Sequence, residues 1–169
     1  MKSALALPIP AAYSLDSYIQ TVNRYPMLSL EEEQAYARAW HERMLDVARD
    51  YAGRGVRTLA INSNDAGRYP ADSFEAMAER VSSEGGWPHP FLHDADQSVA
   101  RAWGAEKTPH LFVLDGDLRL RYAGAPDADY DDPDQNAAGL REALDAVLAG
   151  ETPDPAQTTA VGCGVKWKG

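Results

Sequence analysis

The hydrophobic pattern of the chain changes character after its first 52 residues. Over residues 13–52, apolar side chains recur every three or four positions, which is the spacing of amphipathic helices. We expect a short helix over residues 13–25, ended by Pro26, and a longer one that Ser29 caps and that runs to Tyr51. Its last turns place on one face the residues Met44, Leu45, Val47, Ala48 and Tyr51.

From Gly53 onward, short apolar runs alternate with helical segments, as is typical of an α/β domain. VRTLAI (56–61) and HLFVLD (110–115) are predicted to be buried strands, and LRLRYAG (118–124) a strand with one face toward solvent. A short strand is predicted at positions 91 and 92. We expect helices over residues 72–81, 97–103 and 137–149. A proline-containing tail follows at 151–169.

Composition and charge narrow the classes of function. A chain of 169 residues that is 44% hydrophobic and 25% charged suits one globular domain with an appendage. Sixteen basic against 26 acidic residues give a formal charge of −10, which disfavours binding to nucleic acid or to anionic lipid. No apolar run approaches the roughly 20 residues that a membrane span needs. We therefore expect a cytoplasmic protein.

Cys163 is the only cysteine of the chain, so the sequence excludes an intrachain disulfide and a zinc site built from several thiolates. Gly162 and Gly164 would leave its thiol accessible, and Lys166 and Lys168 would favour the thiolate. The alternative, which we favour, is a spare thiol on a flexible tail without a redox role.

Four separated motifs carry a family resemblance: LAINSNDAGRYPADSFEAM, FLHDADQSVARAWGAEKTPHLFVLD, LRLRYAG and GCGVKWK. Together they resemble the redoxin branch of the thioredoxin superfamily, of the alkyl hydroperoxide reductase and thiol-specific antioxidant type, over about residues 40–169. The resemblance implies a thioredoxin-like three-layer α/β sandwich and thiol-dependent reduction of peroxides or protein disulfides. Thr108 and Pro109 match the position where this family holds a cis-proline against its substrate, which makes them the candidate substrate-binding residues.

The nucleophile of that family is missing from this chain. In redoxins it lies in a C-x-x-C loop after the first strand, and no cysteine or comparable strand precedes Trp40. Because a thiolate is the attacking group, we expect turnover to be absent or weak, with Cys163 as the one candidate catalytic residue. The fold should be incomplete at its first strand, which in the family lies between the strands that VRTLAI and HLFVLD resemble. That loss predicts two unpaired edges, to be met by self-association, a donated strand or a rearranged sheet.

Residues 3–38, and LDSYIQTVNRYPMLSLEEE above all, resemble the N-terminus of a bacterial heat-shock sigma factor. This resemblance implies an alternative function, a non-enzymatic fusion or interaction module that contacts RNA polymerase. We accordingly divide the chain into a helical N-terminal appendage (1–39), a thioredoxin-like domain (40–150) and the tail (151–169).

For the remaining candidate residues, the sequence favours structural roles over functional ones. His89 and His93 have helical metal-pair spacing, but Pro88 and Pro90 prevent that helix, so we place both in a solvated loop. His110 either approaches a substrate or, as we favour, satisfies a strand end. The acidic stretch 127–138 lacks the glycine and glutamate of a calcium loop. We expect no metal and no organic cofactor.

Overall fold

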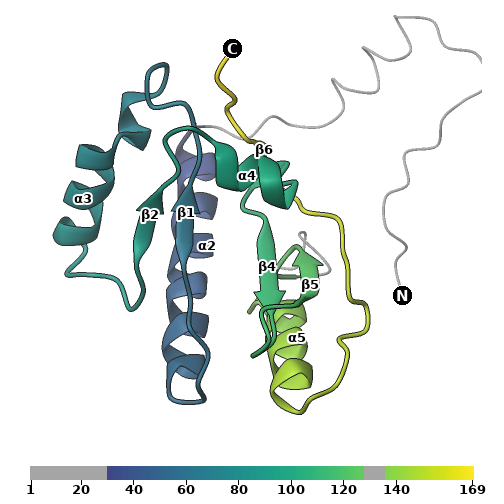
Figure 1. Ribbon diagram of the computed structural model, residues 1–169. Helices are drawn as coiled ribbons and strands as arrows, with labels where there is room; N and C mark the ends of the chain where they lie inside the picture. The colour runs from purple at the N-terminus through teal and green to yellow at the C-terminus, as the bar shows by residue number, and fades with distance from the viewer. Residues whose placement is uncertain (1–29, 128–135) are drawn as a thin grey trace, which may run out of the picture. The chain divides into compact units, whose positions relative to one another are not determined.

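The computed structural model describes residues 30–127 and 136–169 (Figure 1). The helix expected over residues 13–25 and most of the acidic stretch lie outside the described residues. The chain divides into two compact units, Met1–Ala39 and Trp40–Gly169. The helix α2 (Leu30–Ala52) begins in the first unit and ends in the second, and it confirms the long helix predicted from Ser29 to Tyr51.

The second unit has a mixed α/β architecture, which confirms the coarse fold class predicted from the alternating pattern. Among its described residues the strands form three separate pairs: β1 with β2 in parallel, β4 with β5 antiparallel, and β3 with β6 antiparallel. After α2 the elements are, in order, β1 (Ala60–Asn62), η1 (Pro70–Asp72), α3 (Phe74–Ser83), β2 (Phe91–His93), α4 (Ser98–Trp103), β3 (Lys107–Thr108), β4 (Leu111–Leu114), β5 (Leu120–Gly124), α5 (Ala138–Leu148) and β6 (Cys163–Gly164).

Capping hydrogen bonds and glycine conformations set the ends of the helices. The hydroxyl of Ser73 accepts a hydrogen bond from the Ala76 N–H at 3.3 Å and caps α3. Gly104 ends α4 in the left-handed conformation, with a φ of 65°, which glycine adopts without steric cost. These signals are local in the sequence, and so α3, α4 and α5 all fall within a few residues of their predicted ranges.

The strand β1 is shorter than predicted, because only the end of the run 56–61 has a partner. Ala60 donates its N–H to the carbonyl of Pro90 at 3.0 Å, and the pairing register begins at Ala60 and Phe91. In the stretch just before β2, Pro88 and Pro90 have no N–H to donate, so the β1–β2 pairing does not extend toward Val56.

The strand β5 also begins later than predicted, at Leu120 instead of position 118. The carboxylate of Asp115 accepts the N–H groups of Asp117 and Arg119, each at 3.0 Å, and this closes the turn between β4 and β5. Leu118 lies in that turn with a positive φ of 61°, outside the extended conformation that a strand requires.

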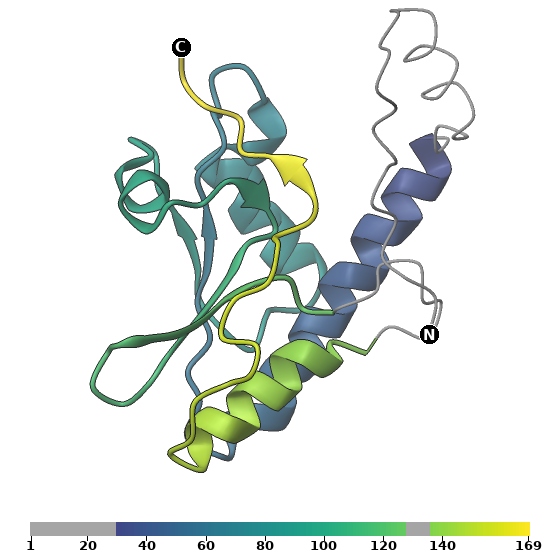
Figure 2. The same cartoon turned by 90° about the vertical axis from the view of Figure 1, so that its right-hand side faces the viewer.

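The hydrophobic core lies on one side of the strands. Val47 and Tyr51 from α2 pack with Val113 of β4, Tyr122 of β5 and the apolar face of α5, which includes Leu140 and Leu144. Figure 2 shows α2 and α5 together on this side, whereas only the short α4 lies on the other. On that second side Leu59, Ile61 and Leu92 are 59%, 45% and 44% exposed.

β1 and β4 stay in separate sheets, so the rearranged sheet considered above does not form in the described part of the chain. In Figure 1 they are the two inner strands, with β2 and β5 as their outer neighbours. No helix among the described residues is both long and apolar enough to cross a membrane.

Candidate functional site

The three candidate site residues of the sequence meet at the pairing of β3 with β6. Thr108 is the register partner of Cys163 in this antiparallel pair, and Val165 donates its N–H to the Glu106 carbonyl at 3.2 Å. The Thr108–Pro109 peptide bond is cis, the geometry that the resemblance implied. The fold therefore places the one thiol of the chain directly across from the Thr-Pro pair.

Gly162 allows the two segments to approach closely. Its φ is 147°, and a Cβ built on it would collide with the carbonyl group of Thr108. Any larger residue would push the tail away from β3, and with it the adjacent thiol. Cys163 itself is a free, exposed cysteine, so its sulfur is accessible to a solute.

The tail that carries Cys163 is fixed to the rest of the unit by partly buried hydrogen bonds. Gln97 is 1% exposed, and its Nε2 donates to the carbonyls of Ser63 at 2.7 Å and Lys166 at 2.9 Å. Its Oε1 accepts the N–H of Lys168 at 2.8 Å, while Asn64 Oδ1 accepts the N–H of Lys166 at 3.0 Å. The tail is thus not the flexible appendage that its composition suggested.

Gln97 and Asn64 were not among the residues singled out from the sequence. Each lies in a polar segment between elements and contacts residues about 70 to 100 positions away, so no local spacing marks it. The backbone of Gln97 is left-handed, with a φ of 62°, but only the structure reveals this.

Neither tail lysine serves the thiol as expected. The ammonium group of Lys166 lies over the ring of Tyr69, 4.7 Å from its centroid. Lys168 donates from Nζ to the Ala95 carbonyl at 2.7 Å. Both ammonium groups therefore contact other residues of the unit.

His110 accepts a hydrogen bond from the backbone at a strand end, the role that we favoured, because Glu106 directly precedes β3. Its Nδ1 accepts the N–H of Glu106 at 3.4 Å, and its ring stacks on Phe112 with the centroids 4.4 Å apart. Burial lowers the pKa of His110, against a smaller opposing effect of the Glu106 carboxylate. The neutral imidazole thus accepts a hydrogen bond here.

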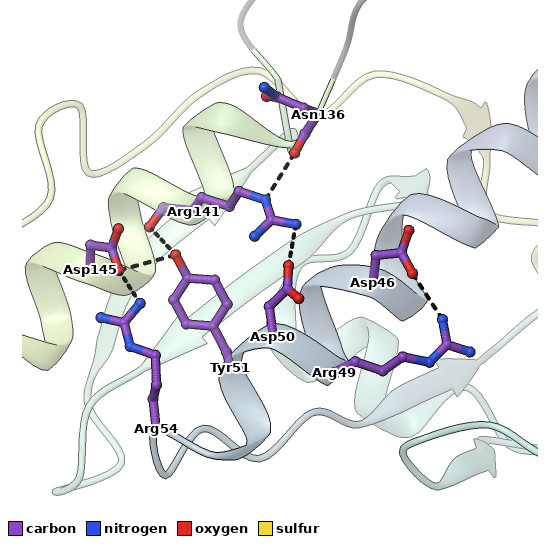
Figure 3. Close-up of polar contacts among 8 residues, drawn as sticks. All are labelled: Asp46, Arg49, Asp50, Tyr51, Arg54, Asn136, Arg141 and Asp145. Atoms are coloured by element: carbon purple, nitrogen blue, oxygen red, sulfur yellow. Dashed lines mark hydrogen bonds and ion pairs between the residues drawn. The ribbon is translucent and has the colours of Figure 1, made fainter.

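A second polar cluster joins the end of α2 to α5 (Figure 3). Tyr51 donates from its hydroxyl to Asp145 Oδ1 at 3.0 Å, and Arg54 donates to the same carboxylate at 2.6 Å. Arg141 pairs with Asp50 at 2.7 Å. The bond from Arg54 lowers the pKa of Asp145, and burial raises the pKa of Tyr51. These groups partner one another, so the cluster fastens two helices together and leaves no group free to act on a substrate.

Of the two histidines predicted to lie in a solvated loop, His89 lies outside the helices and strands as expected. The prediction is wrong for His93, which ends β2 as the register partner of Asn62. His93 stacks on Phe74 with the centroids 6.5 Å apart, and His89 Nδ1 lies 3.1 Å from the Pro90 carbonyl. Within residues 30–127 and 136–169, no three histidine, cysteine, aspartate or glutamate side chains are arranged to hold a metal ion.

Comparison with solved structures finds relatives of this arrangement. The hypothetical protein SMc02350 from Sinorhizobium meliloti 1021 is 40% identical, with a TM-score of 0.69 over 75% of this chain and 70% of its own. This chain and SMc02350 belong to one family. Because the first unit holds only residues 1–39, a match of that extent includes most of the second unit.

The SMc02350 family reaches beyond one organism. An uncharacterized conserved protein from Geobacillus kaustophilus is 39% identical, with a TM-score of 0.69 over 73% of this chain and 66% of its own. Part of each relative's chain therefore has no counterpart in the match. Neither protein is described as a redoxin, and no curated protein matches this chain.

The N-terminal segment has a separate match. The family model for region 1.2 of sigma-70 factors matches residues 14–44, which supports the sigma-like N-terminus predicted from the sequence. The match includes the first turns of α2 and ends at Met44.

Proposed function

We propose that this chain is a redoxin-related protein with a thioredoxin-like scaffold that does not complete thiol–disulfide turnover. The element order from β1 to α5 supports the scaffold, as does a β4–β5 hairpin that packs on α2 and α5. The single observation that carries the proposal is the position of Cys163. It is the one thiol of the chain, and its register partner is Thr108, the residue before Pro109.

The chemistry open to one thiol is limited. Attack of the Cys163 thiolate on a disulfide breaks the S–S bond, forms a mixed disulfide and releases one thiolate. With a hydroperoxide, the thiolate becomes a sulfenic acid and the hydroperoxide is reduced to an alcohol. Each product needs a thiol from another molecule to restore Cys163. We therefore propose stoichiometric reaction with a disulfide or peroxide substrate, without an efficient cycle.

An insulin-reduction assay and a hydroperoxide-consumption assay test this proposal, with dithiothreitol as reductant and Cys163→Ser as the matched control. Before dithiothreitol is added, we expect the wild type to consume about one equivalent of hydroperoxide per chain and C163S none; afterwards, the wild type should complete only a few turnovers, because it lacks a second cysteine to resolve each product. Intact-mass spectrometry with glutathione disulfide should nonetheless find one adduct on the wild type and none on C163S. Many turnovers by the wild type alone would overturn the inactive assignment, and turnover by both proteins would overturn the assigned role of Cys163.

The match to sigma-70 region 1.2 favours a second candidate function, a non-enzymatic module that contacts RNA polymerase. Purified core polymerase on a biosensor tests it with the full chain and with a chain that lacks residues 14–29. Binding that disappears with this segment supports the module, whereas equal signals from both chains, or none from either, reject it.

A further inference from the structure

The turn between β4 and β5 presents an exposed leucine in an unfavourable backbone conformation. Leu118 has a φ of 61° and is 80% exposed. Glycine or asparagine adopts a left-handed backbone more readily than leucine, whose Cβ crowds the following carbonyl. An apolar side chain that remains in water also contributes little to the stability of a single chain. The turn itself therefore does not explain a leucine at this position, whereas a contact with another molecule does.

Hydrogen bonds fix the backbone that carries Leu118. Its N–H donates to the Asp115 carbonyl at 3.0 Å, and the Asp115 N–H donates to the Arg119 carbonyl at 3.0 Å. The Asp115 carboxylate accepts two further N–H groups of the same turn. Figure 2 shows this turn on the α4 side of the strands, away from α2 and α5. A side chain held in this way binds without the entropic cost of ordering a loop.

An apolar pocket of about 280 Å³ opens beside this turn. Residues from α4, β4, β5 and the turn line it: Ala102, Trp103, Leu114, Leu118 and Leu120. Trp103 and Leu120 are 44% and 55% exposed. The Trp103 ring packs edge-on against Phe112 with the centroids 5.2 Å apart, which holds the ring in place. Apolar walls suit an apolar occupant, and an exposed tryptophan beside a pocket is typical of protein interfaces.

The charges around Leu118 are of both signs. Asp117 and Arg119 flank it, form an ion pair at 3.2 Å, and have side chains that are 72% and 71% exposed. Residues 117–119 thus carry no net charge, in contrast to the formal charge of −10 of the chain. Beyond about 8 Å, repulsion between the other charges is screened at physiological salt. A two-fold axis near Leu118 would set Arg119 of each copy of the chain opposite Asp117 of the other.

We propose that two copies of this chain associate through the surface formed by Trp103, Leu118 and Leu120. Leu118 of each copy inserts into the pocket beside Trp103 of the other, and Asp117 pairs with Arg119 across the contact. The surface is self-complementary, because the projecting leucine, the pocket that suits it and charges of both signs lie side by side on it. A contact of this extent is small, so the dimer is weak and reversible. It uses none of the residues of the proposed thiol chemistry.

Sedimentation equilibrium of the full chain tests the proposal. A phosphine reductant is present, so that a disulfide through Cys163 cannot join two copies. Between about 5 and about 500 µM, we expect the mean mass of the wild type to rise from that of a monomer toward that of a dimer. A wild type that stays monomeric over this range would overturn the proposal.

Leu118→Asn separates the contact from the fold. Asparagine suits the left-handed conformation, so the variant should unfold at a urea concentration no lower than the wild type does. It removes the projecting apolar side chain and should weaken dimerisation by about tenfold or more. Leu148→Asn is the matched change of an exposed leucine on α5 and should dimerise like the wild type. Dimerisation of L118N as tight as that of the wild type, or an equal loss in both variants, contradicts the proposed contact.

Charge reversals test the two-fold geometry. Arg119→Asp or Asp117→Arg alone sets like charges opposite each other and should weaken dimerisation by about fivefold. The turn is retained in both variants, because Asp115 bonds to the backbone of these two residues. The double variant restores opposite charges and should dimerise within about twofold of the wild type. If the double variant stays as weak as the single ones, the copies do not meet in this arrangement and the proposal fails.

Discussion

The two faces of the strands in the second unit differ sharply. On the α2 and α5 side, Leu144 is 7% exposed and packs in one cluster with residues from two helices and two strands. On the other side, Leu59 is 59% exposed although it directly precedes a strand. Residues of the same type thus meet opposite environments in one unit. The comparison teaches that the helices α2 and α5 bury one face of the strands, whereas large apolar side chains stay exposed on the other.

Leu144→Ala should have the largest effect, because it removes a side chain from the packed face. We expect the free energy of unfolding to fall by about 2 to 5 kcal/mol. Leu59→Ala is the matched change on the open face and should stay within about 0.5 kcal/mol. Urea denaturation followed by circular dichroism measures both. A loss of similar size for L59A would mean that the open face is covered.

Gly124→Ala should separate the tail from β5. Gly124 has a φ of 149°, and a Cβ there would collide with Thr158, whose N–H bonds to Ala123. We expect a loss of about 1 to 3 kcal/mol, with faster amide exchange in the tail. Gly53→Ala is the control, since its Cβ would meet no atom within 4 Å. Unchanged tail protection in G124A would contradict the assignment of the tail as part of the packed unit.

Tyr51→Phe should have a moderate effect, because it keeps the ring in the core and removes only the hydroxyl. The hydroxyl donates to Asp145 at 3.0 Å and to the Arg141 carbonyl at 3.2 Å. We expect a loss of about 1 kcal/mol in urea denaturation. In the Asp145→Asn background the same substitution should cost less, and strictly additive losses would show that the hydroxyl and this carboxylate do not act together.

The smallest effect concerns pH. Because burial holds the pKa of His110 below its ordinary value of 6.5, the neutral ring stabilises the fold fully above that value, and this contribution is lost as pH falls through the lower folded pKa. Urea midpoints between about pH 8 and about pH 5 should fall less in His110→Phe than in the wild type. An equal fall of the urea midpoint in the two proteins would show that His110 is not the source of this pH dependence.

Much of the fold followed from local signals. Ser73 and Gly104 mark helix ends through hydrogen bonds that span a few residues, so the ends of α3 and α4 were predictable. The glutamates after Ser29 indicated the start of α2 by sequence pattern alone. The face of α2 that includes Leu45, Val47 and Tyr51 was also predictable, because burial follows helical periodicity. The lengths of the strands were not predictable, because they depend on where a segment distant in the sequence offers N–H groups.

The candidate site was predictable in its members and not in its geometry. Thr108, Pro109 and Cys163 could be named from sequence motifs, but their meeting depends on β6 pairing with β3. Gln97 and Asn64 escaped notice because both act on a tail about 70 to 100 positions away. The tail lysines were misjudged for the same reason, since Tyr69 and Ala95, which they contact, are remote in sequence.

By itself, the sequence determined the helices, the approximate positions of the strands, the formal charge of −10 and the presence of one thiol, because these depend on neighbouring residues or on composition alone. Only the tertiary structure decided that Cys163 pairs with Thr108, that Gln97 holds the tail and that β1 and β4 lie in separate sheets. Backbone pairing between distant segments has no periodicity of its own, so it becomes visible only when the chain is folded.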